Sequence, residues 1–276
     1  ENICYPPKNW TGATDNWDNP AGWTPAGVPT TQDKVLLDVG DNVTVPAGFT
    51  ALARSVYLSG GAALTVGATG TLAINGAAED GMQVAGANTS VTIAGSLKIG
   101  ENTAIYRHGI YLTGGTFTTL STSLIEINRT TTGEGINSTI SFTNNGALHI
   151  GNIASIKTNG LYLNGMKTFT NAAGAICTID NVLEGAGIRP QAGGTLSNSG
   201  TLLIGNSTAI QNFGINCILC ALNNLAGGQI EINRVTNDAG INMGSTSGST
   251  LSNAGSIKIG NIAAVKGGIN NSLNAS

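Results

Sequence analysis

The sequence predicts an all-β fold: a right-handed parallel β-helix of about eight coils, each of about 27 residues with three short strands, and an N-terminal cap. Three observations predict it. Short sequence words return at a nearly constant interval, and apolar residues alternate with others inside each word. Gly or Asn, which accept left-handed backbone conformations, usually follows. No long stretch shows the 3.6-residue period of a helix.

The composition fits a repeat protein with small, uncharged turns. The 276 residues include 40 glycines and are 41% hydrophobic but only 10% charged, against about 25% charged in a typical domain. Plentiful apolar residues and a net charge of −3 are not the signature of disorder. The sequence has no run of Lys or Arg of the kind that binds nucleic acid. It also has no apolar run close to the roughly 18 residues that a membrane-spanning helix needs. We therefore expect no nucleic-acid partner, no transmembrane segment and no cofactor.

Residues 1–34 are predicted to form the cap, and residues 35–276 the β-helix, with regular repeats from about residue 62. All three tryptophans lie in the first segment, at Trp10, Trp17 and Trp23. An uncapped first coil would expose core and strand edges, so we interpret this segment as the cover. The alternative is a carbohydrate platform, because tryptophan rings stack on sugars.

The first repeated word is apolar-x-apolar followed by Gly, Asn or Asp, and it returns at intervals of 23 to 29 residues. Its middle residue is expected to point outward while its neighbours point into the core. Stacking successive coils predicts an outward column of Ala73, Lys98, Glu126, His149, Thr178, Leu203, Glu231 and Lys258. Lys98 then faces Glu126, and Glu231 faces Lys258, pairs that support a sheet.

Two further words stay in phase with the first. One is Gly followed by an apolar residue, beginning at Gly81. The other is Phe or Leu, then a polar residue, then Asn, and it predicts an asparagine ladder hydrogen-bonded from coil to coil. The ladder comprises Asn144, Asn171, Asn198, Asn224 and Asn253.

A longer period of two coils, about 53 residues, is superimposed on the single coil. Nearly identical heptapeptides, GSLKIGE, GALHIGN, GTLLIGN and GSIKIGN, begin at Gly95, Gly146, Gly200 and Gly255 and occupy every second coil. We interpret the heptapeptide as a strand followed by a corner. We assign the heptapeptide no catalytic role.

The opening resembles a known class of proteins. The residues WTG…NW…NPAGWTPAGVPT, followed by SVYLSGGAALTVGATGTLAING, are similar over about residues 9–76 to the start of secreted β-solenoid modules in large bacterial surface proteins. Such modules occur in Bacteroidota proteins exported by type IX secretion and in autotransporter passengers. The resemblance implies export, an extracellular or cell-surface location and, in many members, a role in adhesion or gliding. It also implies a sorting domain after the solenoid where type IX export is used.

One cluster of chemically active residues is predicted. The turn before the Gly-apolar word places Asp80, His108 and Glu134 on consecutive coils, followed by Asn159. Carboxylates and histidine on one face can perform acid–base chemistry, so the cluster is a candidate binding or glycan-active site. The alternative is a polar column on a solvated turn. We predict no catalytic residues and no metal site.

Cys217 and Cys220 have CxxC spacing, which allows a local disulfide or, equally, two buried thiols. One such pair is a weak zinc signal.

These patterns favour a non-catalytic extracellular rod of a bacterial cell-surface protein or filament, adhesive or structural. The alternative is a glycan-binding or polysaccharide-degrading β-helix. Expected partners are surface glycans, further copies that form fibres, and other cell-surface or secretion components. No capping segment follows Gly267, so we expect either more chain beyond residue 276 or another molecule covering this end.

Overall fold

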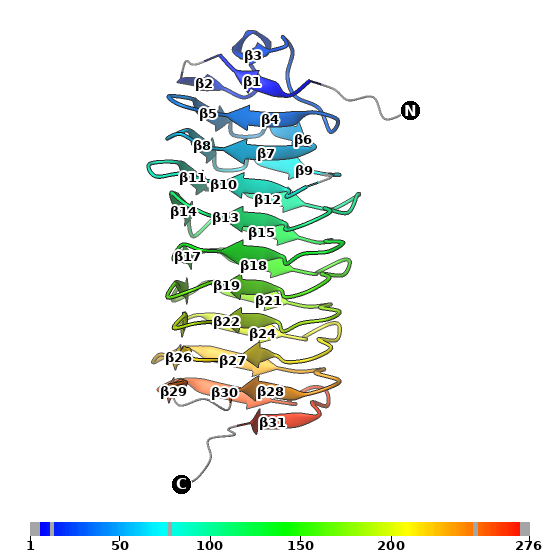
Figure 1. Ribbon diagram of the computed structural model, residues 1–276, viewed down its shortest axis with the longest axis vertical. Helices are drawn as coiled ribbons and strands as arrows, with labels where there is room; N and C mark the ends of the chain where they lie inside the picture. The colour runs from blue at the N-terminus through cyan, green and yellow to red at the C-terminus, as the bar shows by residue number, and fades with distance from the viewer. Residues whose placement is uncertain (1–5, 12–13, 77–78, 245–247, 271–276) are drawn as a thin grey trace.

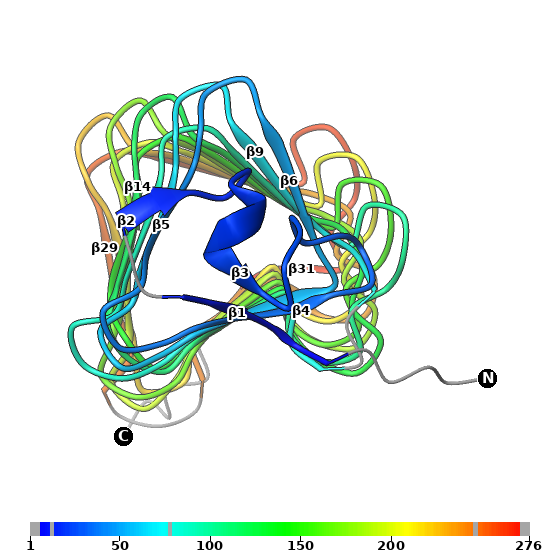
Figure 2. The ribbon, with the colours of Figure 1, turned by 90° about the horizontal axis from the view of Figure 1, so that it is seen from above.

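The computed structural model describes residues 6–11, 14–76, 79–244 and 248–270. These residues wind into an elongated β-solenoid with the N-terminus at one end (Figure 1). Viewed from that end, the chain runs clockwise from β4 through β5 to β6 while receding from the viewer, so the coil is right-handed (Figure 2). Three parallel sheets form its sides, which confirms the predicted fold class.

Each sheet collects one strand from every coil. Sheet A comprises β3 (Trp23–Thr24), β1 (Lys8–Trp10), β4 (Lys34–Leu37), β7 (Ser55–Leu58), β10 (Met82–Val84), β13 (Ile110–Leu112), β16 (Ile136–Ser138), β19 (Leu161–Leu163), β22 (Ile188–Pro190), β25 (Ile215–Asn216), β28 (Ala239–Asn242) and β31 (Gly267–Asn270). Sheet B comprises β2 (Thr14–Asn16), β5 (Asn42–Val45), β8 (Ala63–Val66), β11 (Ser90–Ile93), β14 (Thr116–Thr119), β17 (Phe142–Asn144), β20 (Thr168–Asn171), β23 (Thr195–Asn198), β26 (Ala221–Asn224) and β29 (Thr250–Asn253). Sheet C comprises β6 (Thr50–Ala53), β9 (Thr71–Ile74), β12 (Ser96–Ile99), β15 (Leu124–Ile127), β18 (Ala147–Ile150), β21 (Ile176–Ile179), β24 (Thr201–Ile204), β27 (Gln229–Ile232) and β30 (Ser256–Ile259).

The described chain contains nine coils, since sheet C has nine strands. That is one more than the repeated words predict. The additional coil is the first, in which Val35 pairs with Val56, 21 positions later. It is short because a single residue, Arg54, joins β6 to β7. Its sheet C strand also carries small core residues, Ala51 and Ala53, in place of the usual large aliphatics.

The register of sheet C is the one predicted from the first word. Glu126 pairs with Lys98 and with His149, and Glu231 pairs with Lys258. The Lys98 ammonium lies 3.4 Å from the Glu126 carboxylate. Residues on either side of this outward column are buried from Leu72 to Ile232 and form a continuous apolar core, against which the partly buried Ile257 and Ile259 pack. Ala73 departs from the pattern, because it is buried although it lies in the outward column.

The tryptophan segment lies over the first coil at the N-terminal end (Figure 2). Here β1 pairs with β4, and β3 pairs antiparallel with β1 after the 3₁₀ turn η1 (Pro20–Gly22). Trp17 and Trp23 are fully buried and their ring centroids lie 5.0 Å apart. The Trp23 indole N–H donates to the Trp17 carbonyl. Because Trp10 is buried as well, these rings do not form the exposed sugar platform considered as an alternative.

The two-coil period has its origin at the corner between sheets B and C. Four residues make this corner in one coil and two in the next; Leu120–Ser123 is followed by Asn145–Gly146. The short corner passes so close beneath the long one that a Cβ on Gly146 would lie 2.5 Å from the Ser123 carbonyl oxygen. Glycine is therefore needed at the start of every heptapeptide. The same close approach recurs at Gly95, Gly200 and Gly255.

Candidate functional site

The predicted polar cluster lies on the turns that lead from sheet C into sheet A. Asp80, His108 and Glu134 each precede a glycine at the entrance to β10, β13 or β16. A Cβ on Gly109 would lie 2.7 Å from the Gly135 carbonyl oxygen, so successive turns can stack closely only with glycine there. This stacking brings the three side chains together in a single column along the rod.

The structure joins the members of the column by hydrogen bonds between coils. The His108 backbone N–H donates to Asp80 Oδ1 at 3.1 Å. His108 Nδ1 lies 2.7 Å from Glu134 Oε2. Asn159 Nδ2 donates to Glu134 Oε1, and Asn159 Oδ1 accepts from the Ala186 N–H. Asp80 Oδ1, His108 Nδ1, the two Glu134 oxygens and the Asn159 amide thus each link one coil to the next.

Glu134 is held as a carboxylate. Burial by itself raises the pKa of Glu134, but hydrogen bonding and charge attraction from His108 outweigh it and lower the pKa below the usual value. Asn137 Nδ2 also donates to this carboxylate. A carboxyl with a lowered pKa is a poor proton donor near neutral pH. As it stands, the geometry suits a structural acceptor better than a general acid.

Charges beside the column are compensated locally. The Lys34 ammonium lies 2.8 Å from the Glu79 carboxylate, and Arg107 Nη1 lies 3.8 Å from Asp80 Oδ2. Across the described part of the chain, no group of three or more His, Cys, Asp or Glu side chains is arranged to hold a metal ion. Nor is any helix in that part long and apolar enough to cross a membrane.

The predicted asparagine ladder lies at the inner edge of sheet B. Asn144 Nδ2 donates to Asn171 Oδ1, and the same bond repeats from Asn171 to Asn198, Asn198 to Asn224, and Asn224 to Asn253 at 2.8–2.9 Å. Asn144, Asn171, Asn198 and Asn224 are almost completely buried. Each also donates to a carbonyl in the next coil or corner, for example Asn171 to Thr201. The ladder is therefore a structural element inside the rod.

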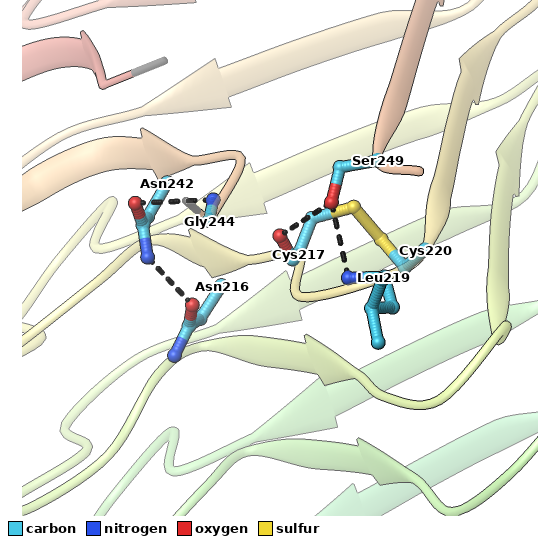
Figure 3. Close-up of a disulfide and its surroundings, with 7 residues drawn as sticks. All are labelled: Asn216, Cys217, Leu219, Cys220, Asn242, Gly244 and Ser249. Atoms are coloured by element: carbon cyan, nitrogen blue, oxygen red, sulfur yellow. Dashed lines mark hydrogen bonds between the residues drawn. A yellow bond between two sulfur atoms is a disulfide. The ribbon is translucent and has the colours of Figure 1, made fainter. Parts of the chain in front are cut away.

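Cys217 and Cys220 form a disulfide at the corner between β25 and β26 (Figure 3). The bridge is buried, while Leu219 between the two cysteines is exposed and has a positive φ of 53°. Ser249 Oγ binds this corner from the next coil by donating to the Cys217 carbonyl and accepting from the Leu219 N–H. Cys177 is a buried free thiol whose pKa burial raises to about 12, so it is inert.

Sequence reasoning missed a column of tyrosines on the outer face of sheet A. In the register of this sheet the outward residues are Tyr57, Gln83, Tyr111, Asn137, Tyr162 and Arg189. Tyr57, Tyr111 and Tyr162, which we name the tyrosine column, occupy every second coil and are partly exposed. Stacking the Gly-apolar words as the first word was stacked would have revealed it.

The tyrosine column borders the polar column directly. The Tyr111 and His108 ring centroids lie 5.1 Å apart. Tyr162 donates from its hydroxyl to Gln191 Oε1, and the Arg189 guanidinium lies 5.9 Å from the Tyr162 ring centroid. Neighbouring side chains thus restrain two of the three rings.

Comparison with known proteins identifies one similar family. A family model described as a domain of unknown function, DUF8693, matches residues 9–97. That segment covers the tryptophan region and the first coils, up to β12. No curated protein and no solved structure matches the chain.

Proposed function

We propose that this chain is a non-catalytic extracellular rod of a bacterial cell-surface protein, structural or adhesive in its role. The main support for this proposal is that hydrogen bonds connect every coil to the next along the axis of the solenoid. Three parallel sheets and a buried amide ladder link each coil to the next, which favours a stiff, extended body.

Two further observations support an extracellular location. The Cys217–Cys220 disulfide is typical of oxidising compartments outside the cytosol. The opening of the chain also resembles secreted bacterial surface modules. Surface glycans, further copies of the chain and other cell-surface components are the partners that such a rod would meet.

Immunolabelling of intact cells tests this proposal. An antibody raised against the rod is expected to label unpermeabilised cells that encode the chain, and deletion of the gene is expected to reduce attachment to surfaces. The control is an antibody against a cytosolic protein. Labelling that requires permeabilisation, or attachment unaffected by the deletion, would contradict the proposal.

Polysaccharide degradation is the second candidate, favoured by the 2.7 Å contact between His108 and Glu134. If Glu134 takes part in turnover, Glu134→Gln should abolish the release of reducing ends from polysaccharides. Retained turnover would exclude this site, and absence of turnover by the unaltered protein would leave the rod as the better proposal.

A further inference from the structure

We propose that the outer face of sheet A binds an extended, uncharged, β-linked glycan, with sugar rings stacked on the tyrosine column. This inference rests on the proposed adhesive role and assigns it a ligand class and a surface. It concerns Tyr57, Tyr111 and Tyr162, which lie outside the hydrogen-bonded polar column.

The outer face of sheet A is rich in aromatic side chains, which first suggests a sugar-binding surface. Three tyrosines share one column, although aromatic residues make up only 5% of the chain. Tyrosine offers a large, rigid and amphipathic contact area at a low entropy cost. Sugar rings present C–H groups on their faces and hydroxyls at their edges, and this complements an aromatic ring with polar neighbours.

The spacing of the tyrosines is the second argument. Gln83 and Asn137 occupy the coils between them, so the rings are two coils apart, or about 9.6 Å at the usual strand separation. This distance is close to the length of a disaccharide unit in an extended β-linked chain. Such a chain lying along the axis would place every second sugar beside a tyrosine, whereas a helical α-linked chain would leave the column.

The polar flank of the column is the third argument. Glu79, His108 and Glu134 lie beside the tyrosines, and each faces an opposite or hydrogen-bonding partner. Apart from Arg189, the outward residue in the coil after Tyr162, the charged side chains beside the column are paired, so the face has little excess of one sign to attract a polyanion or a polycation. Carboxylate, amide and imidazole groups can still exchange hydrogen bonds with hydroxyls. This combination favours a neutral polyhydroxylated ligand.

A small indentation marks the N-terminal end of the column. It has a volume of about 10 Å³, room for roughly one water, and is lined by Tyr57, Gln83, Glu79 and Lys34. A hydroxyl or a bridging water fits there beside the first ring. Further along the column Tyr111 and Tyr162 are partly exposed, as contact with a bound chain requires.

The test measures binding of defined oligosaccharides by calorimetry. Cellohexaose and chitohexaose serve as extended β-linked probes, maltohexaose as the α-linked contrast and cellobiose as the short contrast. At least one β-linked hexasaccharide is expected to bind, with maltohexaose and cellobiose about tenfold weaker or more. The double variant Tyr57→Gln, Tyr111→Gln is expected to lose about tenfold in affinity or more.

Glutamine is chosen because Gln83 already occupies the same column, so the fold is expected to tolerate it. Tyr106→Ala is the matched control: Tyr106 is 52% exposed and lies outside the column. The inference fails if no β-linked probe binds, if the double variant binds as well as the unaltered protein, or if Tyr106→Ala weakens binding equally. Circular dichroism of each variant verifies that the solenoid is intact.

This test separates the ligand from the general role. Purified protein that binds no glycan, together with positive surface labelling of cells, would exclude the glycan face and leave the surface rod standing. Glycan binding by a protein confined inside cells would exclude the surface rod and keep the binding face.

Discussion

In sheet B the last residue of β5, β8 and β11 is aliphatic, whereas the last residue of β17, β20, β23, β26 and β29 is asparagine. Val45, Val66 and Ile93 pair in register through the first three coils, and all are fully buried. From Asn144 onward the same position carries the amide ladder. The same core position of sheet B is therefore occupied by aliphatic residues in the first coils and by asparagines in the later ones.

Thr119 lies at the boundary between the two halves, and its side chain carries both a hydroxyl and a methyl group. Its Oγ1 donates to the Thr143 carbonyl and accepts from the Asn145 N–H. Between β14 and β17 only Thr118 and Thr143 pair, whereas β11 and β14 pair at four positions. A surface hollow of about 440 Å³, lined by Thr116, Ser141 and their neighbours, lies where β14 meets β17.

The buried polar column fits into this core because its amides lie on successive coils and bond to one another. An amide with amide neighbours on both sides satisfies its donors and acceptors, while an amide among aliphatics would leave them unpaired at a cost. The aliphatic column needs no such continuity. We therefore expect each half to be destabilised when it receives the residue type of the other half.

The largest effect is expected from Ile93→Asn, which places an amide in the aliphatic half. Ile93 is fully buried between Val66 and Thr119, so the change removes apolar packing and buries polar atoms beside an aliphatic neighbour. The local free energy of opening is expected to fall by about 3–5 kcal/mol. Hydrogen exchange of peptides from the third and fourth coils measures it.

Ile93→Val is the matched control, because it keeps the column aliphatic and removes one methylene. It is expected to cost about 1 kcal/mol. Equal protection of the two variants would show that the N-terminal half accepts an isolated amide, and the distinction between the halves would then be lost.

A somewhat smaller effect is expected from Asn171→Leu, which interrupts the ladder. The change deprives Asn198 Oδ1 and the Thr201 carbonyl of a donor. Leaving buried acceptors unpaired is expected to cost about 2–3 kcal/mol in the affected coils, again measured by local hydrogen exchange. A cost no larger than that of the exposed control Asn164→Leu would indicate that the ladder is dispensable.

The double variant Asn171→Leu, Asn198→Leu sharpens this result. Two adjacent apolar residues leave fewer unpaired groups between them than the two single changes leave separately. We expect a cost clearly below the sum of the single costs. Simple additivity would mean that the amides do not act as a connected ladder.

Much of the architecture was predictable because the strand words have nearly constant length. Their register follows from spacing alone, and that fixes the sheet C pairs and the alignment of the ladder residues Asn144 to Asn253. The first coil lies within the predicted β-helix but was left out of the predicted count of coils. Ala51 and Ala53 are small and Arg54 alone forms its corner, so neither the word nor the interval matches the others.

Contacts between loops were less predictable, because the loops between sheets C and A differ in length. A second buried polar column there, in which Asn75 Oδ1 accepts from the Asn102 N–H and Asn128 Oδ1 from the Ile153 N–H, had no sequence signal beyond the Asn that follows each strand. Likewise the sequence places Asp80, His108 and Glu134 on consecutive turns, but their bonding depends on side-chain direction. In the structure the side-chain directions let these residues form hydrogen bonds and ion pairs between coils.

The smallest effect is expected from acid, and it distinguishes the coils of the His108–Glu134 contact from the ladder coils that follow them. Glu134 has a folded pKa below its ordinary value of 4.5, so it contributes stability above about pH 4.5 that is lost as the pH falls through the folded pKa. The neutral amides of the ladder do not titrate in this range. Hydrogen exchange between pH 5 and pH 3 should therefore show coils around β13 and β16 losing protection before those around β20 and β23.

Glu134→Gln should remove this difference, because a glutamine cannot take up the proton. At neutral pH the variant is expected to lose about 1 kcal/mol through the weaker bond to His108, and its stability should then change less with pH. Glu184→Gln is the control, since Glu184 forms an exposed ion pair with Lys157, which contributes little. If the unaltered protein and Glu134→Gln lose protection in parallel on acidification, the carboxylate is not what makes the coils around β13 and β16 acid-sensitive. The His108–Glu134 contact would then have to be reconsidered as a free acid–base pair.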